Sequence, residues 1–258
     1  KWSLRIKLKK GHFFRGMRYF SLQAPKTREF HHELIVQKHL QQHQILTPKY
    51  FFSTASINGQ SMGIMAVEEW PETTLLERQG FREGTIFRFD ESAMWAHMQN
   101  NVNAGPFNDV REAGIKSYQK VHRKPKHPLH REWQEAFSMM EGFIAGKLSL
   151  EQVFDLPKIF LFFAIADIWG AGHTIEDHNR RFYLNPITRK FEPLSYELDP
   201  KYPSIFFDEK SSQQIYRGLD GRSLLENPSL LEKYRTVLKE IKTEIEDAEF
   251  IRKAKDLD

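Results

Sequence analysis

The chain contains no cysteine, which excludes disulfide bonds, thiolate metal sites and cysteine nucleophiles but does not identify a compartment. It has no run close to the ~18 apolar residues that a membrane-spanning helix requires. Neither a Gly-x-Ser-x-Gly turn nor a Gly-x-x-x-x-Gly-Lys loop occurs, so the sequence supports neither a hydrolase triad nor a P-loop nucleotide site. The 11 histidines lack the tight His-x-Glu/His spacing of zinc sites, so zinc is not expected.

Basic residues are spread along the chain rather than concentrated. The formal net charge is +4 at a sequence pI near 9.1, and no combined aromatic and basic motif typical of RNA binding is present. We therefore expect no nucleic-acid partner. Hydrophobic residues make up 40% of the 258 residues and include 21 phenylalanines, enough for a substantial core in one large domain or two small lobes. Because the chain opens on Lys1-Trp2-Ser3 inside an expected strand, we expect a fragment or a processed form.

Residues 1–90 are expected to form a small lobe with an antiparallel sheet and one main helix. Apolar residues alternate with Arg5 and Lys7 in the first strand, a pattern typical of a strand with one solvated face. Asn58-Gly59 predicts a hairpin because both residues tolerate positive φ. The other expected elements are strands at 18–23, 50–55, 61–68 and 85–89 and a helix at 28–44.

A polar, turn-rich connecting segment is expected over 91–129, followed by a helical region over 130–258. The basic, proline-broken stretch 122–128 is interpreted as a solvated linker, with a substrate-docking surface as the alternative. Ser149-Leu-Glu-Gln152 fits a capping box, and the almost wholly apolar stretch 157–169 predicts a buried helix. The remaining expected elements are a helix at 130–146, strands at 182–184 and 191–196, and a helix from Asn227-Pro228 past Phe250.

Polar side chains gather around the two strands expected after the buried helix. The stretch Ala171-Gly-His-Thr-Ile-Glu-Asp-His-Asn-Arg-Arg-Phe-Tyr-Leu-Asn-Pro186 is followed by Tyr196-Glu-Leu-Asp199. Oxygen donors on neighbouring strands are what nucleotide-bound Mg²⁺ or Mn²⁺ requires, so the cluster predicts a phosphoryl-transfer site. A sheet-rich N-lobe, a helical C-lobe and a β-hairpin at their junction form the α+β, bilobal arrangement of protein kinases, although architecture alone does not establish function.

An ordered set of short motifs resembles the CotH kinase family, which is named for spore coat protein H. The resemblance spans about residues 1–200 and implies an atypical kinase fold, ATP bound between the lobes, and a divalent metal held by an Asn and an acidic residue. The motifs are Ser3-Leu-Arg-Ile-Lys-Leu8, Phe20-Ser-Leu-Gln-Ala-Pro-Lys-Thr-Arg28, a helix with Glu33, Ile57-Asn-Gly-Gln-Ser-Met-Gly63, Val67-Glu-Glu69, His178-Asn179 with Tyr183, and Tyr196-Glu-Leu-Asp199.

The resemblance also implies roles for the polar cluster. Asn179 and Glu197 match the metal-binding positions, where the family often has Trp-Asp-x-Asp in place of Tyr196-Glu197-Leu198-Asp199, and Asp199 is a possible second ligand. The alternative is a surface acid and a turn-forming Asn. The family frequently has a catalytic Asp five residues before the Asn, and Thr174 occupies that position. We therefore expect the catalytic role to fall on the neighbouring carboxylates and imidazole, namely Asp177, Glu176 and His173.

Phosphate binding requires a cation in the N-terminal region. Lys7 or Arg5 is expected to reach the α- and β-phosphates of ATP, with Glu33 orienting Lys7 through an ion pair. A solvated strand face is the alternative, and Lys26 is a rival cation. Glu68 is expected to contact adenine from the end of its strand, with an ordinary charged strand end as the alternative.

The resulting prediction is an Mg²⁺- or Mn²⁺-dependent kinase that transfers the γ-phosphoryl group of ATP to a hydroxyl, expected to be on a protein Ser or Thr. Thr174, and Glu197 in place of Asp, favour the alternative of a pseudokinase-like binding or assembly module. A structural cell-surface protein without a nucleotide site is the third possibility. The resemblance alone favours an extracytoplasmic or cell-surface setting.

Overall fold

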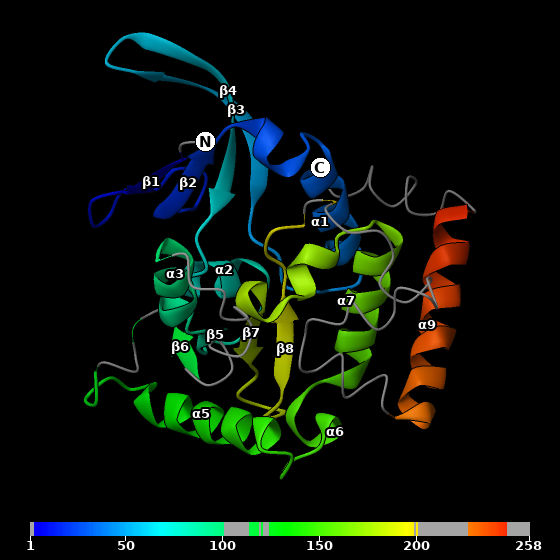
Figure 1. Cartoon of the computed structure of the whole chain (residues 1–258). Coiled ribbons are helices and arrows are strands. Elements are labelled where there is room, and N and C mark those ends of the chain that lie inside the picture. Colours follow the sequence, from blue (N-terminus) through cyan, green and yellow to red (C-terminus); the bar gives the residue numbers. More distant parts are fainter. Residues whose placement is uncertain are drawn as a thin grey trace.

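The structure is a computed structural model that describes residues 3–100, 114–118, 120, 124–198, 200 and 227–246. Within these ranges the architecture is mixed α+β, with two four-stranded antiparallel sheets and helices packed around them (Figure 1). The expected α+β class is therefore confirmed. In the same ranges, each helix is too short or too polar to cross a membrane.

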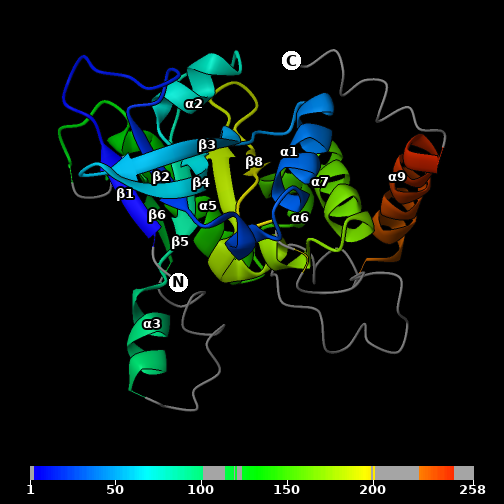
Figure 2. The ribbon, with the colours of Figure 1, turned by 90° about the horizontal axis from the view of Figure 1, so that it is seen from above.

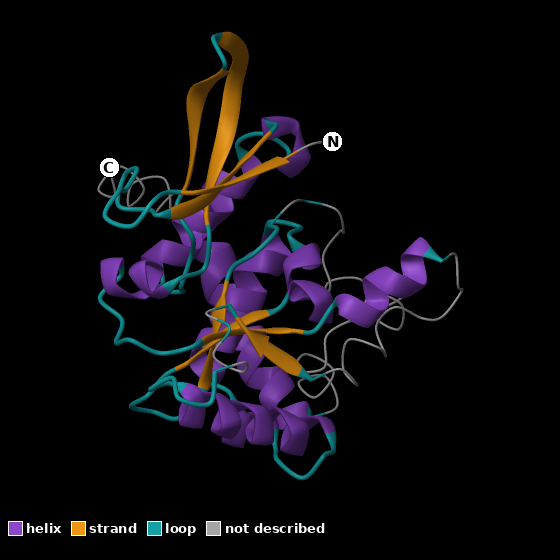
Figure 3. Cartoon of the chain, turned by 90° about the vertical axis from the view of Figure 1, so that its left-hand side faces the viewer, coloured by secondary structure: helices purple, strands orange, loops and turns teal. Residues whose placement is uncertain are grey.

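The first sheet is built from the N-terminal strands. Its order is β1-β2-β4-β3, with β1 at Ser3–Lys7, β2 at Tyr19–Gln23, β3 at Tyr50–Ile57 and β4 at Gln60–Glu69. Asn58 and Gly59 join β3 to β4 with φ values of 51° and 79°, which confirms the predicted hairpin. The hairpin projects away from the rest of the molecule (Figure 3).

The expected helix over 28–44 is divided by a sharp turn. A 3-10 turn at Pro25–Arg28 comes first, and the α-helix α1 at His32–Gln42 follows. Between them Glu29 and Phe30 both have positive φ, 49° and 55°, a conformation that non-glycine residues rarely adopt. The break places Arg28 at the end of one element and Glu33 in the first turn of the next.

The second sheet has the order β6-β5-β7-β8. We expected residues 85–89 to join the first sheet, but β5 pairs with β6 and β7. Phe87 and Phe89 on β5 are buried against Phe191 and Phe182, with ring centroids 5.8 Å and 6.0 Å apart. This long-range aromatic packing decides where β5 pairs. The strands are β5 at Ile86–Phe89, β6 at Ile115–Ser117, β7 at Arg181–Leu184 and β8 at Phe191–Leu194.

Part of the expected connecting segment is ordered structure. The helix α3 at Ser92–Gln99 and the strand β6 lie within 91–129, a stretch in which we expected neither. Its residues 101–113, 119 and 121–123 fall outside the described ranges. The expected boundaries at 90 and 130 stay a prediction.

The predicted apolar helix is α7 at Leu156–Ile168, and it lies in the middle of the main hydrophobic core. α1 packs on one side of it and α9, at Pro228–Glu246, on another (Figure 2). The remaining helices are α2 at Thr73–Arg78, α5 at His130–Ile144 and α6 at Leu150–Val153.

Two predicted helix starts are confirmed by their hydrogen bonds. The Ser149 N–H donates to Gln152 Oε1 at 2.8 Å as part of a capping box at the start of α6. Asn227 Oδ1 accepts from the N–H groups of Ser229 and Leu230 at 3.1 Å and 3.2 Å, which starts α9. The expected continuation of α9 past Phe250 lies outside the described residues.

Replacing Phe162 by Ala tests how far the fold depends on α7. Phe162 is fully buried, so we expect the cavity left by Phe162→Ala to lower the free energy of unfolding by about 3–5 kcal/mol in urea titration. Ile187, whose side chain is 65% exposed, supplies the control, and Ile187→Ala is expected to change stability by less than about 0.5 kcal/mol. Similar losses for the two variants would contradict this account of the core.

Candidate functional site

Arg28 lies at the centre of a group of carboxylates between the two sheets. Its Nη2 donates to Glu197 Oε1 at 2.7 Å, and its Nε lies 4.0 Å from Glu33 Oε2. The residue is only 8% exposed. Burial alone would lower the pKa of Arg28, but the charges of Glu68, Glu197 and Glu33 raise it above its ordinary value. The guanidinium therefore stays charged and neutralises part of a buried acidic cluster.

Glu33 ties α1 to the segment that follows β8. Its Oε2 accepts from the Leu198 N–H at 2.8 Å, and its Oε1 accepts from Gln37 Nε2 at 3.1 Å. The side chain is fully buried, and burial raises its pKa to about 8 despite the opposing effect of Arg28. Residues 165 positions apart in the sequence are thus joined directly.

Glu68 contributes a third buried acid from β4. Gln23 Nε2 donates to its Oε2 at 3.4 Å, whereas its Oε1 has no hydrogen-bond partner within the part of the chain that the structure describes. Burial raises the pKa of Glu68, and the charge of Arg28 opposes that rise. A buried, unsatisfied carboxylate oxygen is costly, which makes this position a candidate contact for a ligand.

Glu197 differs from the other acids because it stays ionised. Its Oε2 lies 3.2 Å from His173 Nε2 and its Oε1 accepts from Arg28. Burial would raise the pKa of Glu197, but the hydrogen bonds from His173 and Arg28 outweigh it and lower the pKa to about 2. Glu197 also has positive φ, 54°, so its backbone is held in a conformation that costs energy.

His173 connects Glu197 to the polar loop between α7 and β7. Its Nδ1 lies 3.4 Å from Glu176 Oε2, and the same oxygen lies 3.3 Å from His178 Nδ1. Burial lowers the pKa of His178. Asn179 Nδ2 donates to the backbone oxygen of His173 at 3.0 Å. The structure therefore brings Asn179, Glu197, His173 and Glu176 together.

Two further polar residues of this loop are buried. Asp177 is 1% exposed and starts the 3-10 turn Asp177–Asn179. Thr174 occupies the position at which the resemblance would have a catalytic Asp, and its Oγ1 accepts from the Tyr196 N–H at 3.4 Å. The Thr174 hydroxyl therefore orients the segment that carries Glu197.

The predicted pairing of Lys7 with Glu33 is wrong, because Arg28 is the cation beside Glu33. Lys7 is exposed on β1 with its Nζ 5.9 Å from the ring centre of Tyr19, and Arg5 lies 4.8 Å from the ring centre of Trp70. Lys26 is exposed as well. Asp199 lies outside the described residues, so its expected metal contact stays a prediction.

The sequence patterns did not indicate Arg28 or Arg181 as residues of the site. Arg181 is 2% exposed, donates to the His178 backbone oxygen at 2.9 Å and lies 4.2 Å from the ring centre of Tyr196. An arginine inside the short apolar strand 181–184 was a signal for a buried ion-pairing role. For Arg28 the signal was weaker, because it stands at the start of the expected helix over 28–44, where a charged residue is ordinary.

An open cavity of about 290 Å³ adjoins the site. Trp70, which directly follows β4, and Tyr118 line it with their rings 5.3 Å apart, and the basic side chains Arg88, Lys116 and Lys120 share the lining. Tyr118 lies 5.8 Å from the guanidinium of Arg181, which also contacts Tyr196. Arg88 already pairs with Glu91 and Lys116 with Asp90, so it is mainly the aromatic surface of the cavity that suits a planar ligand.

The donor set at Asn179 and Glu197 fits Mg²⁺ or Mn²⁺. Glu197 is ionised, and the amide nitrogen of Asn179 donates to His173, so the amide oxygen is the atom of Asn179 that would bind a cation. Both are hard oxygen donors, and a nucleotide-bound Mg²⁺ needs only one or two such donors from the protein.

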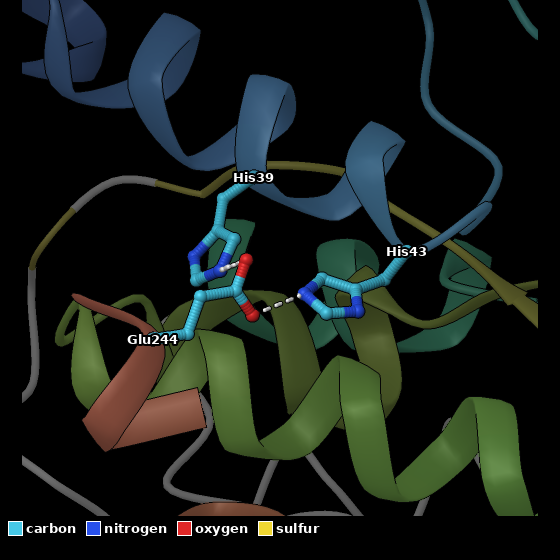
Figure 4. A group of neighbouring side chains, drawn as sticks. All are labelled: His39, His43 and Glu244. Atoms are coloured by element: carbon cyan, nitrogen blue, oxygen red, sulfur yellow. Dashed lines mark hydrogen bonds and ion pairs between the residues drawn. The ribbon is translucent and has the colours of Figure 1, made fainter. Parts of the chain in front are cut away.

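A second group of potential metal ligands lies between α1 and α9. His39, His43 and Glu244 place their ligand atoms within 4.8 Å of one another (Figure 4). His43 Nε2 lies 3.0 Å from Glu244 Oε2, and His39 Nε2 lies 4.0 Å from Glu244 Oε1. His39 lies in the last turn of α1, His43 directly follows the helix, and Glu244 comes from α9. The sequence did not indicate this group because Glu244 is 201 residues from His43.

The hydrogen bond of Trp169 argues against metal binding at this second group. Its indole Nε1 donates to His39 Nδ1 at 2.9 Å. Because an indole N–H can only donate, Nδ1 accepts, and the proton of neutral His39 is on Nε2, facing Glu244. A metal at Nε2 would require that proton to move to Nδ1, against the indole. The three residues therefore form a polar clamp between α1 and α9.

The site is thus a carboxylate- and imidazole-rich junction between two antiparallel sheets, beside a cavity with aromatic and basic walls. The chain belongs to the CotH kinase protein family, whose match covers residues 1–258. Membership implies a kinase-like fold, kinase activity and the use of ATP. No curated protein matched the chain.

The raised pKa of Glu33 predicts a pH-dependent stability. Between its ordinary pKa of 4.5 and its folded value of about 8, the folded state binds a proton that the unfolded state has lost, so stability falls as pH rises. Glu33→Gln cannot ionise, and we expect this variant to gain stability relative to the wild type between pH 5 and pH 8 in urea titrations. Glu232→Gln, at a 70% exposed side chain, should parallel the wild type. Parallel curves for Glu33→Gln as well would contradict the assignment.

If His39, His43 and Glu244 form a polar clamp, Glu244 should matter for stability and Zn²⁺ should have no effect. Glu244→Ala removes the acceptor that faces two imidazoles, and we expect it to lower the free energy of unfolding by about 1–3 kcal/mol and to speed amide hydrogen exchange in α9. Glu246→Ala, at a 62% exposed side chain, is the control. We expect Zn²⁺ to leave the melting temperature of the wild type unchanged. Stabilisation by Zn²⁺ that Glu244→Ala abolishes would show a metal site instead.

Proposed function

We propose that the chain is a divalent-metal-dependent kinase that transfers the γ-phosphoryl group of ATP to a hydroxyl of a protein Ser or Thr. The observation that carries this proposal is the contact of Glu197 with His173, whose backbone oxygen accepts a hydrogen bond from the Asn179 amide. Family membership supports kinase chemistry. The proposed fold is the bilobal one, with the sheet β1-β2-β4-β3 in the N-lobe.

Asn179 and Glu197 are the proposed metal ligands, with Asp199 as a further one. When bound, the metal supplies charge neutralisation for the phosphates of ATP. Glu197 brings the negative charge, and its contact with His173 fixes the direction in which its carboxylate points. The Thr174–Tyr196 hydrogen bond holds the backbone just before Glu197.

We assign the nucleotide base to the cavity beside Trp70 and Tyr118, where it would lie against aromatic rings. Glu68, whose Oε1 has no hydrogen-bond partner in the described ranges, is the proposed contact for the adenine amino group. Lys7 and Arg5 on the exposed strand β1 are proposed to approach the phosphates. Most of the rate enhancement in such enzymes comes from positioning and electrostatics.

Glu176, Asp177 and His173 are the candidates to receive the proton of the acceptor hydroxyl. His173 and Glu176 contact each other, so a proton taken by the imidazole can be stabilised by the carboxylate. Separate Glu176→Gln, Asp177→Asn and His173→Asn variants distinguish them: the base should lose phosphoryl transfer while keeping metal-dependent ATP binding.

A pseudokinase-like binding or assembly module is the second candidate function. It is favoured by the use of the Thr174 hydroxyl as an acceptor for Tyr196, since no carboxylate takes that place. It is also favoured by the contacts of Glu197, both of whose oxygens already face donors. Such a module would bind ATP with metal and would not transfer phosphate.

Radiolabelled ATP tests the proposal directly. Incubation with γ-labelled ATP and Mn²⁺ should label the chain itself or an added protein substrate, and omission of the metal should abolish labelling. Loss of a residue that only supports a metal ligand typically lowers activity by about 10- to 100-fold. Glu197→Ala removes a proposed ligand itself, so we expect labelling to fall by at least about tenfold. Glu240→Ala, on the exposed side of α9, is the control.

Thermal shift separates the alternatives. A rise in melting temperature with ATP and Mn²⁺ together, without labelling, would support the pseudokinase-like module. No response to ATP under any condition would contradict both candidates. Undiminished labelling by Glu197→Ala would overturn the metal assignment alone.

A further inference from the structure

The contact between Arg28 and Glu197 joins two strained segments of backbone. Glu29 and Phe30, directly after Arg28, have φ values of 49° and 55°, and Glu197 itself has 54°. None of these residues is glycine. Consecutive left-handed residues of this kind persist only where surrounding contacts hold them, and they cluster at switch regions and ligand clamps. The ion pair therefore lies between two turns whose left-handed backbone is held by the surrounding contacts.

Arg28 binds the carboxylate of Glu197, which is also the proposed ligand of the metal. Its Nη2 is 2.7 Å from Glu197 Oε1, with the other oxygen facing His173. A divalent cation bound to Glu197 would lie beside a buried guanidinium, and two positive charges at such short range repel strongly in a poorly solvated site. Metal alone and Arg28 therefore compete for Glu197.

Arg28 also has unused capacity for an anion. Its Nε is buried and lies 4.0 Å from Glu33 Oε2 in an ion pair, but it has no hydrogen-bond partner within residues 3–100, 114–118, 120, 124–198, 200 and 227–246. A guanidinium group can bind phosphate through two parallel hydrogen bonds. With Glu197, Arg28 makes a single hydrogen bond, through Nη2. A phosphate group arriving with its own cation would offer Arg28 a new partner as Glu197 is taken.

We propose that Arg28 exchanges Glu197 for a phosphate of ATP when nucleotide and metal bind together. The inference rests on the proposed metal role of Glu197. In the free protein Arg28 suppresses metal binding at Glu197, and Glu197 in turn holds Arg28 away from phosphate. Metal binding takes Glu197 away from Arg28 and so frees Arg28 for phosphate. Phosphate binding takes Arg28 away from Glu197 and so frees Glu197 for metal. Each ligand therefore raises the affinity for the other by the same factor.

Titration calorimetry with MnCl₂ alone, and with ATP in the presence and absence of Mn²⁺, tests the exchange. For Arg28→Gln we expect about a tenfold gain in affinity for Mn²⁺ alone and about a tenfold loss for ATP with Mn²⁺, within the usual range of coupling between sites. Arg28→Lys keeps the charge without the planar fork and should keep the suppression of Mn²⁺ binding. Arg235→Gln, at a 58% exposed side chain, should match the wild type.

A second variant keeps the inference testable if Arg28→Gln does not fold. Glu197→Gln removes the competitor for Arg28, so we expect ATP without metal to bind about tenfold more tightly than to the wild type. Unchanged or weaker Mn²⁺ binding by a folded Arg28→Gln would overturn the exchange, as would unchanged metal-free ATP binding by Glu197→Gln. Failure of the wild type to bind ATP with Mn²⁺ would instead contradict the proposed function, whatever the result with Mn²⁺ alone.

Discussion

The arrangement of the site depends on one buried cation, Arg28, set among Glu33, Glu68 and Glu197. Each acid comes from a different part of the chain: the start of α1, the end of β4 and the segment after β8. Burying a carboxylate without a partner is expensive, and breaking a buried pair costs about 3–5 kcal/mol. The guanidinium therefore makes the approach of these segments possible, and together with His173 it keeps Glu197 ionised. Glu197, in direct contact, has the lowered pKa, whereas Glu33 and Glu68 have raised ones.

α1 transmits this arrangement to the rest of the molecule because it is fixed along its length. Its first turn binds Leu198 through Glu33. His32 contacts the backbone oxygen of Trp169 at 2.8 Å, and the indole of Trp169 donates to His39. Trp169 ends α7 just before the loop that carries His173. A displacement of α1 would therefore move the surroundings of Glu197 from both sides.

Local signals in the sequence predicted local structure well. The Asn58-Gly59 hairpin, the Ser149 capping box and the apolar α7 each depend on residues close together in the chain. The grouping of Asn179 with Glu197 was also within reach, because their flanking strands β7 and β8 are joined by a short turn. Long-range choices were not. β5 joins the second sheet through aromatic packing, and the clamp brings Glu244 of α9 to His39 and His43, about 200 residues away in the sequence.

The sequence patterns also failed to predict which cation lies beside Glu33. Lys7 lies on the polar face of a strand, and this pattern favoured it as the partner of Glu33. In the structure Lys7 is exposed, and its Nζ lies near the ring of Tyr19 rather than near Glu33. Arg28 reaches Glu33 because the chain reverses at Glu29 and Phe30, two residues whose positive φ no propensity rule would assign. The left-handed turn thus places Arg28 beside Glu33, where the expected helix over 28–44 would have continued. Such departures from local rules are expected where a fold serves a site rather than its own stability.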